Sequence, residues 1–538
     1  MAVMAYAPYG AEGIIIRVEA DIRRGIPGVD VTGLAEGAVR EARERVRAAF
    51  RNSGFSFPQD RVLINLAPAG VRKDGASLDL PIALSVMAAA GLVPPPDNTL
   101  VMGELELSGR IRPVRGVLAA VAAGLAAGIR DFIVPAENGR EAAILREGNC
   151  AATATLGEAA HALVIRYETG ALPRTEPPPE GPGFPAFTGD FADVRGQARY
   201  KRALEIAAAG GHNLLVFGPP GAGKTLLARR MPSIMAPLTA DEAVEVTRLY
   251  SLAGRFGPER DGSGGLNPAG ELAAALITHP PFRAPHHSAS AEGILGGGRT
   301  VRPGEISLAH YGALFLDEAP EFRGNVLQAL REPLEDRVIT ISRAEGPVRL
   351  PAEFQLLLAA NPCPCGRLGV RDTAAPGEKF GLSGGGCLCG AEEIYRYWRK
   401  FGAALLDRVE LRAAVAPPKI DEMARAGEED SAAVRSRVAA AVDIQRARFS
   451  GTPVRRNARL PAGMIEPLCP LTGPGMTAFR QAIAKLGLSG RAYHGILRVA
   501  RTIADLEGRD TIDTAHILEA IQHRRQGDDP YDVLNVDG

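Results

Sequence analysis

One short string, GPPGAGKT at residues 218–225, constrains the fold of this chain more than any other feature. It fits the pattern G-x-x-x-x-G-K-[ST], in which the backbone amides of a glycine-rich loop surround phosphate groups. The apolar residues 213–217 before it are typical of a strand, and residues 226–230 after it are typical of a helix. The loop then meets a helix start, whose positive dipole end favours anions. The sequence therefore predicts a P-loop on an α/β core.

Two side chains of this loop carry specific predictions. Lys224 can reach the β- and γ-phosphates of a nucleotide, and the Thr225 hydroxyl can hold Mg²⁺. A glycine-rich turn without function is the alternative, but the flanking strand and helix argue against it. The predicted nucleotide-binding residues of the loop are Gly218, Pro219, Pro220, Gly221, Ala222, Gly223, Lys224, Thr225 and Leu226.

The composition limits what the rest of the chain can be. Of its 538 residues, 46% are hydrophobic, which is enough for several packed domains. Because 62 Lys and Arg residues balance 62 Asp and Glu residues, any contact with DNA would have to be local or inside a ring. The longest apolar stretches are too short for membrane spans, and the first residues lack a signal-peptide pattern. Six cysteines do not make a disulfide scaffold, so we expect a cytoplasmic protein without membrane contact.

Two carboxylates and one amide follow apolar runs downstream of the P-loop. Asp317 and Glu318 end the run that begins at residue 312, a pattern known as Walker B. Asp317 would hold Mg²⁺, directly or through water, and Glu318 would orient and deprotonate the attacking water. Asn361 ends the apolar run 354–360 and would stand between Walker B and the γ-phosphate. A capping Asn is the alternative for this last residue.

These motifs together resemble those of AAA+ ATPases, in which Asn361 corresponds to sensor 1. The V-x-G-Q string that ends at Gln197 is similar to their adenine-side motif, which implies that Gly196 and Gln197 contact the nucleotide. The L-L-x-R string that ends at Arg408 matches the magnesium-chelatase and MCM branch. The resemblance implies that Arg408 enters the neighbouring subunit's site as an arginine finger, whereas a surface arginine is the alternative.

The string Ser489-Gly490-Arg491, followed by Arg498, is similar to the sensor 2 helix in the lid of the same branch. The resemblance implies that Arg491 or Arg498 contacts the γ-phosphate from the lid. The sequence does not choose between the two arginines, and a helix face with ion pairs is the alternative.

The segment 281–318, which begins PFRAPHHSAS, closely resembles the corresponding segment of the YifB/ComM proteins. In this AAA+ branch a loop in this segment faces the central channel of a ring, and its glycine run suits a loop. Arg299 and Arg302 are candidates for binding the backbone phosphates of DNA. The adjacent His286 and His287 lack a further ligand pattern, so we expect ordinary loop residues there.

Four of the six cysteines form two C-x-C pairs with 21 residues between them. Four thiolates suit tetrahedral zinc, and the glycine-rich segment between the pairs could not order itself by burial. Because C-x-C is tighter than the usual C-x₂-C spacing, free thiols or a redox pair are the alternatives. The candidate zinc ligands are Cys363, Cys365, Cys387 and Cys389.

The first 168 residues contain a D-G-x-S turn, a G-E-x-x-x-x-G-x-x-x-P-V turn and an alanine-rich helix that ends in A-G-I before a strand. In this order they resemble the proteolytic domain of Lon-type proteases and the similar domain of RadA, which implies a ribosomal-S5-like α/β fold. Ser77 stands at the place of the nucleophile. Its lysine base should stand at Leu118, which cannot accept a proton. We therefore predict a non-proteolytic domain used for assembly or for binding an unknown protein partner.

Over nearly its whole length, the chain resembles the YifB/ComM family of magnesium-chelatase-like AAA+ ATPases. The resemblance implies a hexameric ring that hydrolyses ATP with Mg²⁺ at subunit interfaces. For the ComM members it also implies branch migration of DNA in natural transformation, so our hypothesis is a DNA translocase or helicase. The alternatives are a chelatase-like motor that remodels a protein partner, a Lon-like ATP-dependent protease, and a passive nucleotide-binding scaffold.

We expect a multidomain α/β protein with five parts. They are a Lon-like, ribosomal-S5-like domain at 1–168, a Pro-rich linker at 169–189, a P-loop AAA+ αβα core at 190–416 with a cysteine insert at 363–389, a helical lid at 417–525 and a flexible tail at 526–538.

Overall fold

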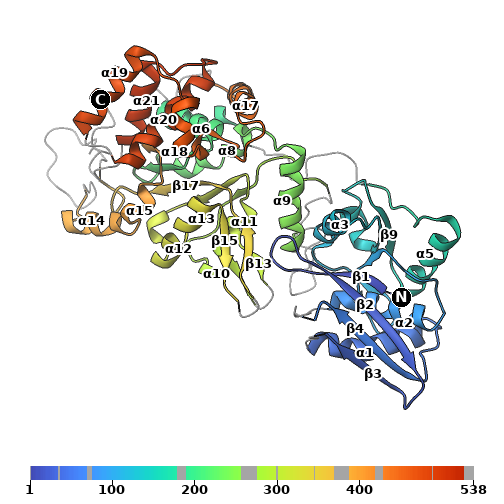
Figure 1. Cartoon of the computed structure of the whole chain (residues 1–538). Helices are drawn as coiled ribbons and strands as arrows, with labels where there is room; N and C mark the ends of the chain where they lie inside the picture. Colours follow the sequence, from blue (N-terminus) through green and yellow to red (C-terminus); the bar gives the residue numbers. More distant parts are fainter. Residues whose placement is uncertain are drawn as a thin grey trace.

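The structure is a computed structural model in which two α/β units, each with its own sheet, follow one another along the chain (Figure 1). The predicted α/β class is confirmed, and the ribosomal-S5-like assignment of the first unit stays a prediction. The predicted tail at 526–538 and residues 178–188 of the predicted linker lie outside the described residues. The structure describes residues 2–33, 37–69, 76–177, 189–255, 275–298, 301–343, 346–368, 387–417, 428–486 and 489–525.

The first unit is built on a seven-stranded sheet with the order β3-β4-β2-β1-β5-β8-β9. Strands β1 and β4 each pair antiparallel with β2, and the other pairs are parallel. Successive residues of a strand point to opposite faces, so Leu100 and Val101 of β5 enter two different apolar cores. The strands are β1 (Ala2–Ala7), β2 (Ile14–Arg23), β3 (Gly28–Thr32), β4 (Arg61–Ala67), β5 (Thr99–Val101), β8 (Asp131–Pro135) and β9 (Asn149–Thr153).

Helices cover both faces of this sheet. Helices α1, α2 and α5 share one core with it, and α3 and α4 share the other. Asp79 at the start of α2 is buried, and Arg45 of α1 donates to its carboxylate at 2.8 Å, which compensates the buried charge. A short hairpin pairs β6 (Glu104–Leu105) with β7 (Ile111–Arg112). The helices are α1 (Gly37–Asn52), α2 (Asp79–Ala89), α3 (Val117–Ala126), α4 (Gly139–Ala142) and α5 (Leu156–Thr169).

The second unit contains a five-stranded parallel sheet with the order β11-β14-β17-β10-β18. Strands β14, β17 and β10 are buried along their whole length, as in parallel sheets covered on both faces. Phe217 at the end of β10 pairs with Ala360 at the end of β17, so the residues after these strands meet at one edge. The strands are β10 (Leu214–Phe217), β11 (Phe282–Arg283), β14 (Ala313–Leu316), β17 (Gln355–Ala360) and β18 (Leu411–Ala414).

Different helices cover the two faces of this second sheet. One apolar core joins it to α6, α7, α8 and the C-terminal helices, and another joins it to α10 to α15. Two hairpins extend the second side: β12 (Gly296–Gly297) with β13 (Arg302–Pro303), and β15 (Val338–Ile341) with β16 (Val348–Pro351). The helices are α6 (Ala198–Gly210), α7 (Lys224–Ala228), α8 (Met231–Ile234), α9 (Ala240–Leu252), α10 (Ala291–Leu295), α11 (Glu305–Leu308), α12 (Gly324–Ala329), α13 (Arg331–Asp336), α14 (Ala391–Arg399) and α15 (Ala403–Leu406).

The described part of the C-terminal region is helical. Helices α17 and α20 pack on α6, and α21 packs on β18, so this region lies against one face of the sheet (Figure 1). Its helices are α17 (Ser431–Arg448), α18 (Ala462–Leu468), α19 (Gly473–Leu486), α20 (Gly490–Leu506) and α21 (Thr514–Arg525).

Helix α9 joins the two units, and its Leu252 packs into the apolar core of the first unit beside α3 (Figure 1). Ser251 Oγ donates a 2.5 Å hydrogen bond to Glu141, whose buried carboxylate also accepts from the Leu118 amide at 3.1 Å. Burial raises the pKa of Glu141, and these donors hold its oxygens. Leu118, where a Lon-type base would stand, is thus part of the joint between the units.

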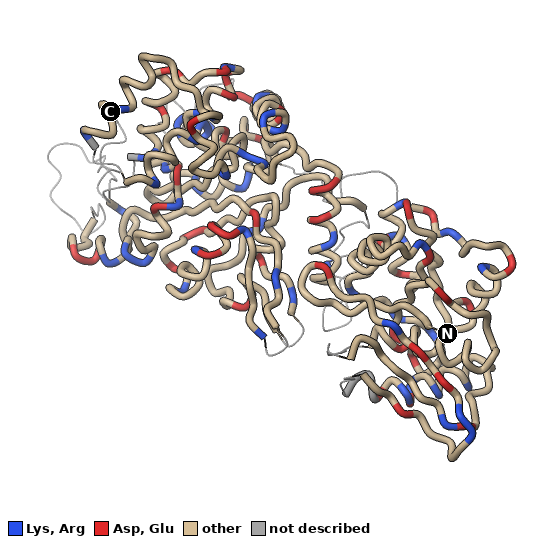
Figure 2. Tube along the Cα trace, viewed as in Figure 1, with Lys and Arg blue, Asp and Glu red and all other residues tan. Residues whose placement is uncertain are grey.

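Charged side chains of both signs are interspersed along both units, in keeping with the balanced composition (Figure 2). Among the helices of the described residues, none is both long and apolar enough to cross a membrane.

Candidate active site

The P-loop joins the end of β10 to the start of α7. Gly221 and Gly223 adopt φ angles of +78° and +82°, which side-chain-bearing residues rarely adopt. Gly218 is required for a different reason, because a Cβ there would lie 2.2 Å from the Val415 carbonyl oxygen. The glycines of the motif therefore set both the curvature of the loop and its close approach to the segment after β18.

Lys224 lies at the centre of the site, and its ammonium group donates hydrogen bonds to uncharged oxygen atoms. Its Nζ donates to the carbonyl oxygens of Gly218 at 2.5 Å and Pro219 at 2.9 Å, and to Asn361 Oδ1 at 3.1 Å. Burial lowers the pKa of Lys224 to about 8, against the opposing effect of Asp317 and Glu318. A buried cation held by neutral acceptors is well placed to bind anionic phosphates.

The two residues predicted to hold Mg²⁺ contact each other. Thr225 Oγ1 donates to Asp317 Oδ2 at 2.7 Å, although 92 residues separate them. A hydroxyl and a carboxylate are hard oxygen donors of the kind that Mg²⁺ prefers, and Mg²⁺ keeps water and phosphate oxygens in its remaining positions. The residues present therefore fit a magnesium ion at this place.

Glu318 follows Asp317 in a left-handed conformation with φ of +48°. Its amide donates to Asp317 Oδ1 at 3.0 Å, while its side chain is 57% exposed. The carboxylate is thus free to contact a water molecule beside the P-loop. His287 Nδ1 lies 3.9 Å from Glu318 Oε2, a neighbour that sequence analysis missed because two adjacent loop histidines carry no spacing signal.

Gln197 contacts the P-loop directly, and Gly196 precedes it in the chain. Gln197 Nε2 donates to the carbonyl oxygens of Ala222 at 3.0 Å and Ala416 at 2.6 Å, and so ties the loop to the segment after β18. The Gly196 amide donates to Glu428 at 2.8 Å. The structure therefore brings the predicted adenine-side residues next to the phosphate-binding loop.

The predicted arginine residues gather in a separate cavity of 460 Å³. Arg408 and Arg491 both form ion pairs with Glu335, and Arg491 also lies 3.3 Å from Asp407. Arg498 lines the same cavity, and burial lowers its pKa. The P-loop is not among the residues that line it.

The two lid arginines predicted to contact the γ-phosphate lie beside Arg408. Within one chain, the structure brings Arg491 and Arg498 to Arg408 rather than to the P-loop. The reason is that α20 packs on α6 and α17, which places its first turn beside Asp407. The three arginines therefore form one group.

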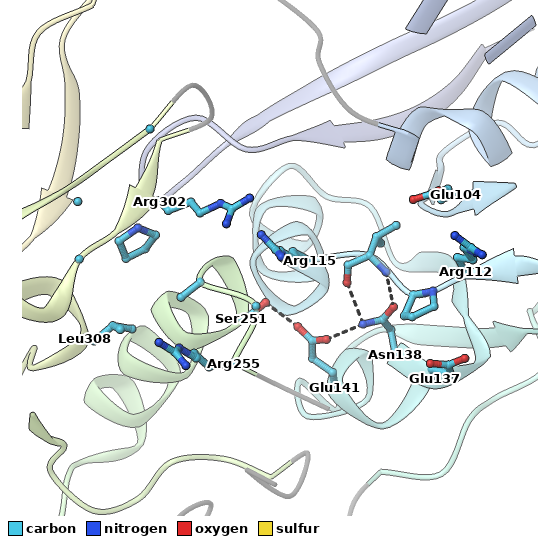
Figure 3. A pocket seen from close by; sticks show the side chains of 18 of the residues that line it. Glu104, Arg112, Arg115, Glu137, Asn138, Glu141, Ser251, Arg255, Arg302 and Leu308 are labelled. Atoms are coloured by element: carbon cyan, nitrogen blue, oxygen red, sulfur yellow. Dashed lines mark hydrogen bonds between the residues drawn. The ribbon is translucent and has the colours of Figure 1, made fainter. Parts of the chain in front are cut away.

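Arg302, a predicted DNA contact, is exposed on β13. It lines a cavity of 1210 Å³ between the two units, and Figure 3 shows Arg302 and Arg115 reaching into this cavity from different units. Glu104, Glu137 and other acidic residues share the lining, so the cavity carries both signs of charge. The other predicted contact, Arg299, lies outside the described residues.

Comparisons with known proteins agree with this architecture. Three family models match: "Magnesium chelatase, subunit ChlI" over residues 190–423, "Subunit ChlI of Mg-chelatase" over 18–138 and "Magnesium chelatase, subunit ChlI C-terminal" over 428–524. The competence protein ComM of Haemophilus influenzae is 38% identical over 534 residues, which cover 97% of each chain. The YifB protein of Escherichia coli is 37% identical over 528 residues and 96% of each chain.

This chain belongs to the YifB/ComM family of magnesium-chelatase-like proteins. Membership in this AAA+ family implies ATPase activity, with ATP and Mg²⁺ as the nucleotide and metal that the P-loop residues fit. A Lon protease of Geobacter metallireducens is 25% identical over 217 residues, which are 38% of this chain and 25% of the protease. The Lon-like resemblance is thus real but partial.

ATP affinity is expected to fall above pH 8. Burial lowers the pKa of Lys224 to about 8, and bound phosphates raise it again. Above that pH the lysine must take up a proton on binding, so the dissociation constant should rise by up to about tenfold per pH unit, and below it the constant should be flat. The measurement is a calorimetric titration of MgATP into Glu318→Gln protein across this range. A constant that does not change above pH 8 would contradict the prediction.

Proposed function

We propose that this YifB/ComM family member is an ATP-driven hexameric ring motor that moves along DNA, with branch migration in recombination or natural transformation as its role. The proposed cofactors are ATP and Mg²⁺ at the P-loop and a structural Zn²⁺ at the four cysteines. The proposed location is the cytoplasm, and the first unit serves assembly or a protein partner rather than proteolysis.

The chemistry assigns one task to each residue of the site. Lys224 binds the β- and γ-phosphates, while Thr225 and Asp317 hold the magnesium ion, which would neutralise charge on the phosphates. Glu318 orients the attacking water and takes its proton. Asn361 is held against Lys224 and positions the γ-phosphate between them.

The observation that supports a ring is the separation of the arginine group from the P-loop. Arg408 and Arg491 cannot serve the nucleotide of their own chain from the cavity that they share with Glu335. A head-to-tail contact between subunits would bring this group to the neighbour's P-loop, and such heterologous contacts form a ring when the rotation between subunits closes. Each active site would then consist of two subunits.

The support for DNA is the competence name of the relative from Haemophilus influenzae together with Arg302 on the β12–β13 hairpin. The neutral net charge and the mixed charges around Arg302 favour the second candidate, a motor that remodels a protein. The two candidates differ in whether nucleic acid changes the rate of ATP hydrolysis.

DNA is expected to stimulate ATP hydrolysis several-fold, and added salt is expected to weaken the effect because phosphate contacts release counterions. The measurement is the ATPase rate with single-stranded, forked and four-way-junction DNA at two salt concentrations, with Glu318→Gln protein as the blank. Arg302→Ala should reduce the stimulation. It should also reduce the slope of log DNA affinity against log salt concentration by about 1. The matched control is Arg23→Ala, whose side chain is 71% exposed in the first unit. A robust rate indifferent to all DNA would favour the protein-remodelling motor.

A further inference from the structure

The four cysteines lie close enough together to share one metal ion. All four sulfur atoms are within 4.8 Å of one another, and three of the sulfur pairs are 3.3, 3.6 and 3.7 Å apart. A disulfide bond requires about 2.05 Å. Four thiolates around a zinc ion at about 2.3 Å would lie about 3.8 Å apart. The spacing therefore fits a tetrahedral metal site and not a pair of disulfides.

Backbone amides support every sulfur of this cysteine cluster. Amide donors of this kind stabilise thiolates and fix the orientation of metal ligands. The backbone amide of Leu368 donates to the sulfur of Cys363, that of Arg367 to Cys365, that of Cys389 to Cys387 and that of Cys365 to Cys389.

The cluster has two arms, the first with Cys363 and Cys365 and the second with Cys387 and Cys389. The first arm contacts the nucleotide site directly. Asn361, which accepts the hydrogen bond from Lys224, lies two residues before Cys363. Gly366, at φ +76°, lies so close to the P-loop that a Cβ there would be 2.9 Å from ring atoms of Pro220. The turn that carries Cys363 and Cys365 is therefore in van der Waals contact with the phosphate-binding loop.

The second arm reaches the same place through α14, which begins two residues after Cys389. Trp398 of α14 donates from Nε1 to the Pro362 carbonyl oxygen at 3.0 Å, and its ring packs edge-to-face on Phe217, with centroids 5.4 Å apart. The backbone amide of Asn361 donates to the hydroxyl of Tyr397. Both arms of the cluster thus converge on the Asn361–Pro362 segment.

We infer that a zinc ion at the cysteine cluster clamps Asn361 against the P-loop, so that the rate of ATP hydrolysis depends on the metal while ATP affinity does not. Four thiolates leave no open position on zinc, so the ion acts by holding the two arms together and not as a Lewis acid. Nucleotide affinity comes mainly from Lys224 and the loop amides, which the cluster does not supply. This inference rests on the proposed ATP hydrolysis at the P-loop.

The test removes both thiols of the second arm of the cluster by the double change Cys387→Ser and Cys389→Ser. We expect one zinc per chain in the wild-type protein by elemental analysis and none in the double variant. The kcat should fall by about 10- to 100-fold, because a misplaced polar group near the γ-phosphate costs about that much. The dissociation constant for ATP should change by less than about twofold. The matched control is Leu388→Ser, whose side chain stands between the two cysteines and is 93% exposed.

A second change separates the clamp from a general structural role. Asn361→Ala should lower kcat strongly in the wild-type protein and little in the zinc-free variant, because two changes that act through one group are not additive. If the double variant does not fold, a thiol-preserving chelator applied to the wild-type protein serves instead. Turnover should then fall as zinc is removed and return when zinc is added.

Several results would overturn the inference. If the wild-type protein binds no zinc, the proposed metal site is excluded. If turnover stays at the full rate after zinc is removed, the proposed effect of the metal on Asn361 is excluded. Equal effects of Asn361→Ala with and without zinc would mean that the metal acts elsewhere. A zinc-loaded wild-type protein that does not hydrolyse ATP would contradict the proposed function itself, and the inference with it.

Discussion

Replacing Glu318 by glutamine is expected to lower kcat for ATP hydrolysis by about 10²- to 10⁴-fold, the usual contribution of a general base. Glutamine has nearly the same shape but cannot accept a proton. Because Glu318 is in the left-handed region and its side chain is largely exposed, the change removes no buried contact. ATP affinity should stay within about threefold, since the proposed phosphate and magnesium contacts come from Lys224, Thr225 and Asp317.

Steady-state hydrolysis and a nucleotide-binding titration on the same preparation check this prediction. Glu321→Gln is the matched control, because Glu321 is also exposed and lies three residues further along, at the end of the short helix Ala319–Glu321. Its rate should equal that of the wild-type protein. A Glu318→Gln protein that hydrolyses ATP at the wild-type rate would exclude Glu318 as the base and favour the passive nucleotide-binding scaffold.

The sequence allowed us to predict which residues lie together at the P-loop because these residues obey a local rule. Asp317 and Asn361 each follow directly on a short apolar run, and the P-loop that carries Lys224 follows directly on another. When such runs form neighbouring parallel strands, their carboxyl ends meet, so the polar residues after them meet too. The contacts of Thr225 with Asp317 and of Lys224 with Asn361 confirm this, although the chain positions differ by 92 and 137 residues.

Features that depend on packing between distant segments were not predictable in this way. Strand β1 lies inside the first sheet, yet its alanine-rich sequence has weak strand propensity and was not assigned. The bond of Ser251 to Glu141 joins two units, and neither residue belongs to a motif. The place of Arg491 beside Arg408 follows from how α20 packs on α6, which the helix sequence alone does not specify.

Arg408→Ala is expected to cause the other largest loss, about 10³- to 10⁵-fold in kcat, if Arg408 is an arginine finger. Within its own chain, the guanidinium pairs with Glu335 and donates to the Ala404 carbonyl oxygen at 2.6 Å. ATP affinity of the single chain should be preserved, because Arg408 does not contact the P-loop of that chain. Arg396→Ala is the matched control, since Arg396 is 73% exposed on α14 and its ion pair with Glu392 is on the surface.

Mixing two inactive variants decides whether Arg408 acts on its own chain or on a neighbour. Lys224→Ala protein lacks a working P-loop but keeps Arg408, and Arg408→Ala protein has the opposite defect. In a mixed ring, a subunit contact is intact where the P-loop of an Arg408→Ala subunit meets the Arg408 of a Lys224→Ala subunit. In random equimolar rings about a quarter of the contacts should be of this kind, so about a quarter of the wild-type rate should return.

The alternative arrangement gives a different result in the same experiment. If Arg408 acted within its own chain, every subunit of the mixture would carry one lethal change, and no activity would return even when native mass spectrometry shows mixed rings. Repeating the mixture with Arg491→Ala in place of Arg408→Ala tests whether the lid arginine acts together with the finger. Because both arginines share Glu335, restored activity in both mixtures would mean that one subunit presents them as a unit to its neighbour's ATP.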